Sequence, residues 1–214
     1  MTIDTTLYVT QQTGGKARMT PMTVVEPEHQ LTHGSFVTVA ADTPVDRIFL
    51  AGFLSACLMQ ARCMAHLYRA VAARTYNEAW RVRYQTSADQ SERHVTGLAD
   101  LVGTLHGDPQ YISPMARLTE ARHTRMMEIR LVTGCADLTL MELTDLEMVL
   151  SGAWQCQADG AVMQALAQRL PDGETRRALT DAGNDLCAEA GAQVTWAQEA
   201  RQALLISQTL TPMP

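Results

Sequence analysis

SERHVTGLADLVGTLHGDP, the stretch from Ser91 to Pro109, has the pattern of an amphipathic helix with a defined end. Residues spaced three and four apart share one face of a helix, and here they are His94, Leu98, Leu101 and Leu105. Gly107-Asp108-Pro109 then ends the helix, because glycine favours the conformation that terminates helices and proline cannot continue one. The sequence therefore predicts a helix over about residues 88–105, with two polar residues, Ser91 and His94, near its beginning.

The same period predicts helices on both sides of this stretch. The predicted helices cover about residues 46–84, 88–105, 114–130, 138–170 and 174–207. Asp46 or Thr43 is expected to cap the first of them. The helix over 114–130 connects the second long helix to the third, so the sequence predicts an all-α fold: an up-down four-helix bundle with one longer crossover.

Residues 1–45 lack a helical period and contain several glycines and prolines. Two β-type segments occur there, Leu7–Val9 and Phe36–Val39. We therefore expect an extended N-terminal arm, followed by the bundle over 46–210 and a tail over 211–214. Because an isolated hairpin is only marginally stable in water, we expect the arm to pack along its own bundle or to reach onto a neighbouring subunit.

The composition suits helices packed on helices. Of the 214 residues, 46% are hydrophobic but only 5% are aromatic, and 12 are methionine. The formal net charge is −6, Lys16 is the only lysine, and the arginines are scattered along the chain. A nucleic-acid-binding surface needs clustered positive charge, so we expect no nucleic acid as a partner.

The five cysteines lie in apolar stretches and form no Cys-x-x-Cys pair: Cys57, Cys63, Cys135, Cys156 and Cys187. A zinc ribbon or a thioredoxin-type site is therefore not expected, and buried reduced thiols indicate a reducing compartment. Residues 1–21 lack the basic and apolar segments of a signal peptide. No apolar run approaches the roughly 18–20 residues of a spanning helix, so we expect a cytoplasmic protein without a membrane partner.

Polar residues that interrupt the apolar stripes are the candidates for a functional site. Each long helix supplies at least one of them, in chain order Gln60, Ser91, His94, Glu147, Glu189 and Gln193. Buried carboxylates need a partner, a metal or a proton. Three interpretations remain open: a structural hydrogen-bond network, a single metal held with the help of Glu189, or a small-ligand pocket. His94, Glu147 and Glu189 are the candidate metal ligands, and no residue is assigned a catalytic role.

Several landmarks occur in an order and spacing similar to those of bacterial ferritin-like domain proteins. They are Leu67-Tyr68-Arg69, the run Gly107–Pro114, Asp145-Leu146-Glu147 and Gln193-x-x-Trp196. The chain therefore resembles the ferritin-like superfamily over about residues 46–210. The resemblance implies a four-helix bundle whose di-iron members take a Glu from helices one and three and a Glu-x-x-His from helices two and four.

The metal-ligand set that this resemblance implies is largely missing. The matching positions are, in chain order, Gln60 or Ala61, Ser91, His94, Glu147, Ala190 and Gln193. Ser91 stands in place of one Glu, and Ala190 and Gln193 stand in place of Glu and His. Two surviving ligands cannot offset the charge of two iron ions. We therefore expect no di-iron centre and no cofactor, with iron or another divalent metal as the alternative.

One intact Glu-x-x-His, Glu120 to His123, falls on the connecting helix among arginines. Such short motifs arise easily by chance, so this pair is interpreted as a solvated helix face. The other histidines are interpreted as surface or cap residues (His66, His106) or as subunit contacts in the arm (His29, His33).

Three hypotheses for the function follow. The first is a non-catalytic ferritin-like bundle that acts as a self-associating structural or binding module. The second is a metal-dependent oxidase or an iron-handling stress protein with an atypical site. The third is a sequestered cargo or stress protein whose protein partner recognises the arm or the tail.

Overall fold

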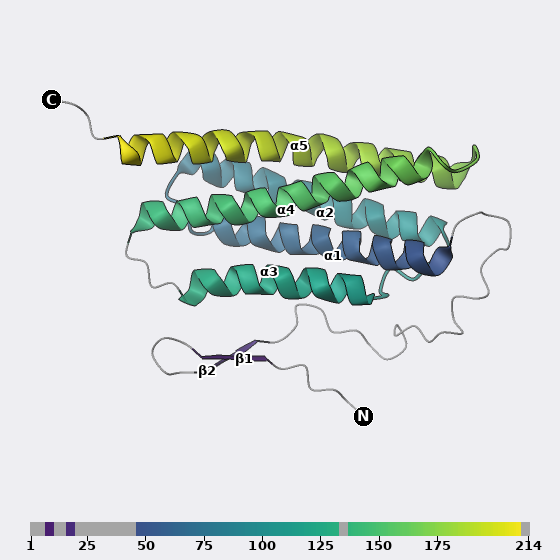
Figure 1. The fold of residues 1–214 in the computed structure, drawn as a ribbon, viewed down its shortest axis with the longest axis horizontal. Helices are drawn as coiled ribbons and strands as arrows, with labels where there is room; N and C mark the ends of the chain where they lie inside the picture. The colour runs from purple at the N-terminus through teal and green to yellow at the C-terminus, as the bar shows by residue number, and fades with distance from the viewer. Residues whose placement is uncertain (1–6, 11–15, 20–45, 133–136, 211–214) are drawn as a thin grey trace.

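The computed structural model describes residues 7–10, 16–19, 46–132 and 137–210. Five long helices make up nearly all of this part of the chain (Figure 1): α1 Arg47–Ala72, α2 Glu78–Thr104, α3 Pro114–Val132, α4 Leu138–Ala167 and α5 Glu174–Thr209. Two short strands, β1 Leu7–Thr10 and β2 Lys16–Met19, form an antiparallel pair. The fold is therefore all-α apart from this hairpin. The first predicted β-type segment forms β1, and the second, 36–39, lies outside the described residues.

The helices lie side by side along the long axis of the molecule (Figure 1). α1 packs against α2, α3 and α4, and α5 packs against α4 and α2, so α1, α2, α5 and α4 close a ring of contacts. α3 lies outside this ring and packs chiefly on α1. The centre of the ring is where polar side chains from four different helices can meet.

α1 begins where the sequence predicted, because Asp46 accepts a hydrogen bond from the backbone amide of Phe49 at 3.1 Å. The expectation that no apolar run is long enough to span a membrane was wrong. Residues 49–72 pass that test by length and composition, with a mean hydropathy of 1.2. Since 67% of that window is buried inside the protein, packing against three other helices accounts for its apolar composition.

The boundary between the first two helices was predicted wrongly. α1 ends at Ala72 rather than near Tyr84, and α2 begins at Glu78 rather than near Ala88. Asn77 caps α2 by accepting from the amide of Trp80 at 3.1 Å, as a short polar side chain does at a helix start. The apolar period continues across this turn, so periodicity alone could not reveal the break.

The end of α2 confirms the predicted stop at Gly107. His106 adopts a left-handed backbone with φ 56°, and the amide of Gly107 donates to the Val102 carbonyl at 2.8 Å, which closes the last turn. A Cβ atom at Gly107 would lie 2.8 Å from the Val102 side chain, so glycine is required here.

Two large apolar clusters fill most of the interior, one towards each end of the helices, and a third, small cluster of Met59, Cys63 and Ala116 joins α1 to α3. One large cluster includes Leu67, Val71 and Leu146, and the other includes Leu58 and Leu98. On α2 the sequence between the two clusters holds mostly polar residues, including Ser91 and His94. The site described next lies at this junction.

Candidate functional site

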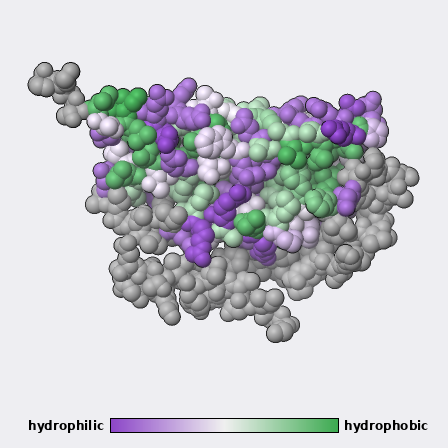
Figure 2. All heavy atoms as spheres, in the orientation of Figure 1, coloured by the Kyte–Doolittle hydropathy of each residue, from purple (hydrophilic) through white to green (hydrophobic). Residues whose placement is uncertain are grey.

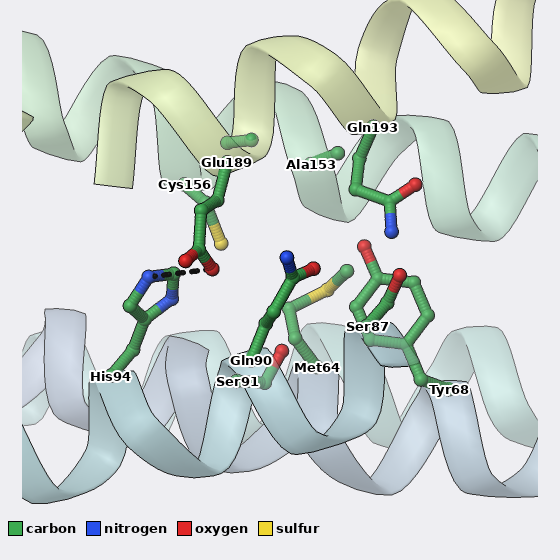
Figure 3. A pocket seen from close by; sticks show the side chains of 11 residues that line it. Met64, Tyr68, Ser87, Gln90, Ser91, His94, Ala153, Cys156, Glu189 and Gln193 are labelled. Carbon is green, nitrogen blue, oxygen red and sulfur yellow. Dashed lines mark ion pairs between the residues drawn. The ribbon is translucent and has the colours of Figure 1, made fainter. Parts of the chain in front are cut away.

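A small central pocket of about 20 Å³ lies within the ring formed by α1, α2, α4 and α5. Figure 3 shows side chains from all four helices converging on it: Met64, Tyr68, Ser87, Gln90, Ser91, His94, Ala153, Cys156, Glu189, Ala190 and Gln193. A cavity needs roughly 10–15 Å³ to hold one water molecule. The central pocket therefore has room for one water or one ion, and not for an organic substrate.

The register predicted for α2 and α5 is confirmed. Ser91 and His94 on α2, and Ala190 and Gln193 on α5, all line the central pocket. Residues three apart on a helix share a face, so these two pairs face one another across the pocket. Ser91, Ala190 and Gln193 are buried, and His94 is partly buried.

At one end of the pocket, His94 Nε2 lies 3.2 Å from Glu189 Oε2, and the two form an ion pair only when the imidazole is protonated (Figure 3). Burial lowers the pKa of His94 below its ordinary value of 6.5, and this effect exceeds the opposite effect of the Glu189 carboxylate. The imidazole is therefore neutral at pH 7. Arg93 approaches the same carboxylate at 3.8 Å and supplies the positive charge nearest to it.

Gln193 is buried at the other end of the pocket, and only one of the two polar atoms of its amide has a hydrogen-bond partner. Its Oε1 accepts from Arg83 Nε at 3.3 Å, whereas its Nε2 has no hydrogen-bond partner in the described part of the chain. Figure 3 shows this amide directed towards the hydroxyl groups of Tyr68 and Ser87. A buried donor without an acceptor costs about 1–3 kcal/mol, so a water in the pocket would relieve this cost.

The prediction that Glu147 points into the bundle was wrong. Its side chain is 48% exposed and forms a surface ion pair with Arg201 of α5. Trp154, two turns further along α4, is 49% exposed. Apolar residues occur on several sides of α4, so their spacing in the sequence did not indicate which face of the helix is buried. The residues that α4 contributes to the central pocket are Ala153 and Cys156.

Gln60 is buried as predicted, but it points between α3 and α4 rather than into the central pocket. Its Nε2 donates to the Gly152 carbonyl at 3.0 Å and contacts Cys156 Sγ at 3.7 Å. Its Oε1 lies 2.8 Å from His123 Nε2. These four residues form a buried chain of polar contacts, called here the Gln60–His123 network, that ends at a residue lining the pocket.

The interpretation of Glu120 and His123 as a solvated helix face was wrong, because both side chains are buried. Glu120 is paired with Arg117 at 2.7 Å, and His123 belongs to the network. α3 packs this side towards α1, a contact that the local sequence of arginines could not reveal. His66 and His106 are exposed, as expected, while His29 and His33 lie outside the described residues.

The described cysteines behave as buried or half-buried reduced thiols, in agreement with the sequence; Cys135 lies outside the described residues. Burial raises the pKa of Cys63 and of Cys156 to about 12. Since the thiolate is the reactive form, neither thiol is a nucleophile at neutral pH. Cys156 can only contribute a weak polar contact to the central pocket.

The residues of the central pocket do not fit a di-iron centre. Such a centre takes four carboxylates and two imidazoles from the four helices, whereas this pocket offers one of each, Glu189 and His94. Among the residues that the structure describes, no cluster of three or more His, Cys, Asp or Glu side chains is placed to hold a metal. No family model, curated protein or solved structure matches the chain.

Proposed function

We propose that this chain is a ferritin-like four-helix bundle of α1, α2, α4 and α5, with α3 as the connecting helix, and that it acts as a non-catalytic, self-associating structural or binding module. The facing pairs Ser91/His94 and Ala190/Gln193 support the assignment. Their three-residue spacing and inward direction are what a Glu-x-x-His pair on each of two helices would show in a di-iron bundle. The ring of helix contacts supports it as well.

The polar groups that line the central pocket support a non-catalytic role. Apart from Glu189, its polar groups are neutral hydroxyls, amides, a protonated thiol and a neutral imidazole. Two iron ions need several anionic oxygens to offset their charge. A pocket with a single carboxylate and about 20 Å³ of space suits a bound water better than a metal cluster.

Metal analysis tests this assignment. Protein purified without chelator should carry well under one iron per chain and should show no oxo-bridged di-iron absorption. A stoichiometry near two irons per chain would contradict the proposal.

The alternative is a metal-binding oxidase or iron-handling protein with an atypical single-ion site. The observation that favours it is the 3.2 Å pair of His94 and Glu189, because both groups are metal-ligand types and both line the pocket. A divalent metal bound at one per chain, and lost in His94→Gln but retained in the surface variant His66→Gln, would replace the first proposal with this one.

Self-association is supported by apolar side chains at one end of the molecule, where α4 begins and α5 ends. Five of them are exposed: Leu138, Leu140, Leu205, Ile206 and Leu210. Figure 2 shows the apolar surface near the end of α5. Contiguous exposed apolar surface is unusual in a monomer and marks interaction sites. We propose that a second copy covers this end and that the arm, residues 1–45, contributes to the contact.

Light scattering tests the assembly. The full chain should be larger than a monomer at micromolar concentration, and removal of residues 1–40 should shift it to a smaller species while helical circular dichroism stays nearly intact. Phe36→Asp should weaken association more than helix content, because an aromatic residue is a common anchor of a contact. A full chain that is monomeric at micromolar concentration contradicts self-association.

A further inference from the structure

A second cavity, of about 190 Å³, lies between α3 and α4 and is separate from the central pocket except for the network that joins them. It is called here the α3–α4 groove, and the residues used below are Gln60, Arg122, His123, Met126, Trp154 and Gln155. α3 packs chiefly on α1, so it leaves space beside α4. The groove is larger than one water and smaller than the roughly 300–1,000 Å³ of drug-sized sites.

The hydrogen bonds at the floor of the groove fix the state of His123. The Gly152 carbonyl can only accept, so the Gln60 amide nitrogen must face it. The Gln60 oxygen must then face His123, and His123 Nε2 carries the proton that it donates. Burial, with a smaller effect of the Arg122 charge, lowers the pKa of His123 to about 4, so the ring is neutral at pH 7.

A neutral ring that carries its proton on Nε2 has a bare acceptor at Nδ1. Within the described part of the chain, His123 Nδ1 forms no hydrogen bond and is not among the fully buried polar atoms that lack a partner, so it is accessible in a residue that lines the groove. The 2.8 Å bond to Gln60 holds the ring in one orientation. The groove thus contains a preoriented hydrogen-bond acceptor.

Three other side chains, Arg122, Trp154 and Met126, give the groove its chemical character. Arg122 is an exposed guanidinium beside His123, and guanidinium groups bind carboxylates through paired, charge-assisted hydrogen bonds. Trp154 lines the opposite side from α4 with 49% of its surface exposed, and Met126 adds a thioether from α3. Aromatic faces and thioethers favour contact with a planar apolar ring.

We propose that the α3–α4 groove binds a small aromatic carboxylate of one ring that carries a hydroxyl or amino donor. The carboxylate pairs with Arg122, the ring lies against Trp154 and Met126, and the donor bonds to His123 Nδ1. This site does not depend on the ferritin-like assignment, because none of these residues belongs to the central pocket.

Isothermal titration calorimetry of the full chain with four probes tests the chemistry. 3- and 4-hydroxybenzoate carry the carboxylate, the ring and the donor; benzoate lacks the donor; phenol lacks the carboxylate. We expect one hydroxybenzoate to bind about 5-fold or more tightly than benzoate, as one hydrogen bond is worth about 1 kcal/mol, and phenol to bind more weakly still. Equal binding of phenol, or no binding by any probe at millimolar concentration, overturns the proposal.

Matched variants test the location. Arg122→Gln should weaken hydroxybenzoate binding about 10-fold, the effect of losing one charge-assisted contact. Arg125→Gln, which removes an exposed arginine of the same helix outside the groove, should change it less than 2-fold. On α4, Trp154→Ala should weaken binding, whereas Val162→Ala, at another exposed apolar position, should not. An equal loss in Arg125→Gln, or no loss in both groove variants, overturns the assigned site.

Discussion

The Gln60–His123 network and the central pocket bury similar polar groups a short distance apart, but they satisfy them differently. In the network, both ends of the Gln60 amide are bonded, to Gly152 and to His123. In the pocket, Gln193 Nε2 has no partner among the described residues and a cavity of about 20 Å³ remains. The two regions share Cys156, so they are neighbours in one core.

This difference distinguishes polar groups that hold helices together from a pocket that can bind a water or an ion. A buried amide with both ends bonded stabilises one arrangement of helices, because breaking either bond leaves a polar group that water cannot reach. A pocket that contains an unsatisfied donor can still form a hydrogen bond with a bound water or ion. The network therefore fixes α1, α3 and α4 relative to one another, whereas removing the unsatisfied donor of the pocket costs less than breaking a bond of the network.

The largest effect is expected from restoring ligands in the central pocket. Ser91→Glu together with Gln193→His adds a carboxylate and a larger ring to a space of about 20 Å³. Burying a charge and overpacking should together lower the free energy of unfolding by about 3–5 kcal/mol in metal-free buffer. Urea denaturation with chelator measures it. The exposed pair Gln85→Glu and Gln198→His is the control, and an equally small loss in both would mean that Ser91 and Gln193 are not inward.

The second prediction compares the stability loss caused by one substitution in the network with that caused by a matched substitution in the pocket. Gln60→Leu should lower the free energy of unfolding by about 1–3 kcal/mol, because it leaves the His123 Nε2 donor buried without a partner and removes the side-chain bond to the Gly152 carbonyl, which keeps its helical backbone bond. Gln193→Leu should change it by less than about 1 kcal/mol, since it removes a donor that is already unsatisfied and a single 3.3 Å bond from the partly buried Arg83. Chemical denaturation of both variants measures the contrast, and equal losses would remove the distinction between network and pocket.

A smaller effect is expected in the pH dependence of the stability of the protein. Burial raises the pKa of Asp159 from 3.8 to about 6, so its contribution makes the protein less stable as pH rises between about 4 and 6. His123, with its pKa lowered from 6.5 to about 4, makes the protein more stable as pH rises between about 4 and 6.5. In the wild-type protein, the contributions of Asp159 and His123 to the pH dependence of stability therefore have opposite signs.

Asp159→Asn should remove the falling contribution and leave the rising one. The melting temperature of the variant should therefore increase more steeply from pH 4.5 to 6.5 than that of wild type, by an amount equivalent to on the order of 1 kcal/mol. Differential scanning calorimetry at several pH values measures the slopes. Parallel profiles would show that the Asp159 carboxyl is not held in a dry environment.

The smallest effect is expected at Glu147. Because its partner Arg201 is also exposed, Glu147→Gln should change the free energy of unfolding by less than about 1 kcal/mol, as surface ion pairs do. Metal content should not change at all. A loss of bound metal in this variant would indicate that Glu147 is a metal ligand.

Much of the fold could be predicted because helix signals are local. Asp46 and Gly107 mark a helix start and a helix end through bonds to residues three and five positions away, and Ser91 and His94 share a face by spacing alone. The break before Glu78 was missed because the apolar period continues across it.

The sequence by itself determined which segments are helical and which α2 and α5 residues meet in the pocket, since period and capping are properties of neighbouring residues. Tertiary packing alone decided the rest. Glu147 lies at the surface and His123 in the interior because of where α5 and α3 pack, not because of their own neighbours in the chain. Burial is a property of the facing helix, so a helix that is apolar all round, or one rich in arginine, does not reveal which side is covered.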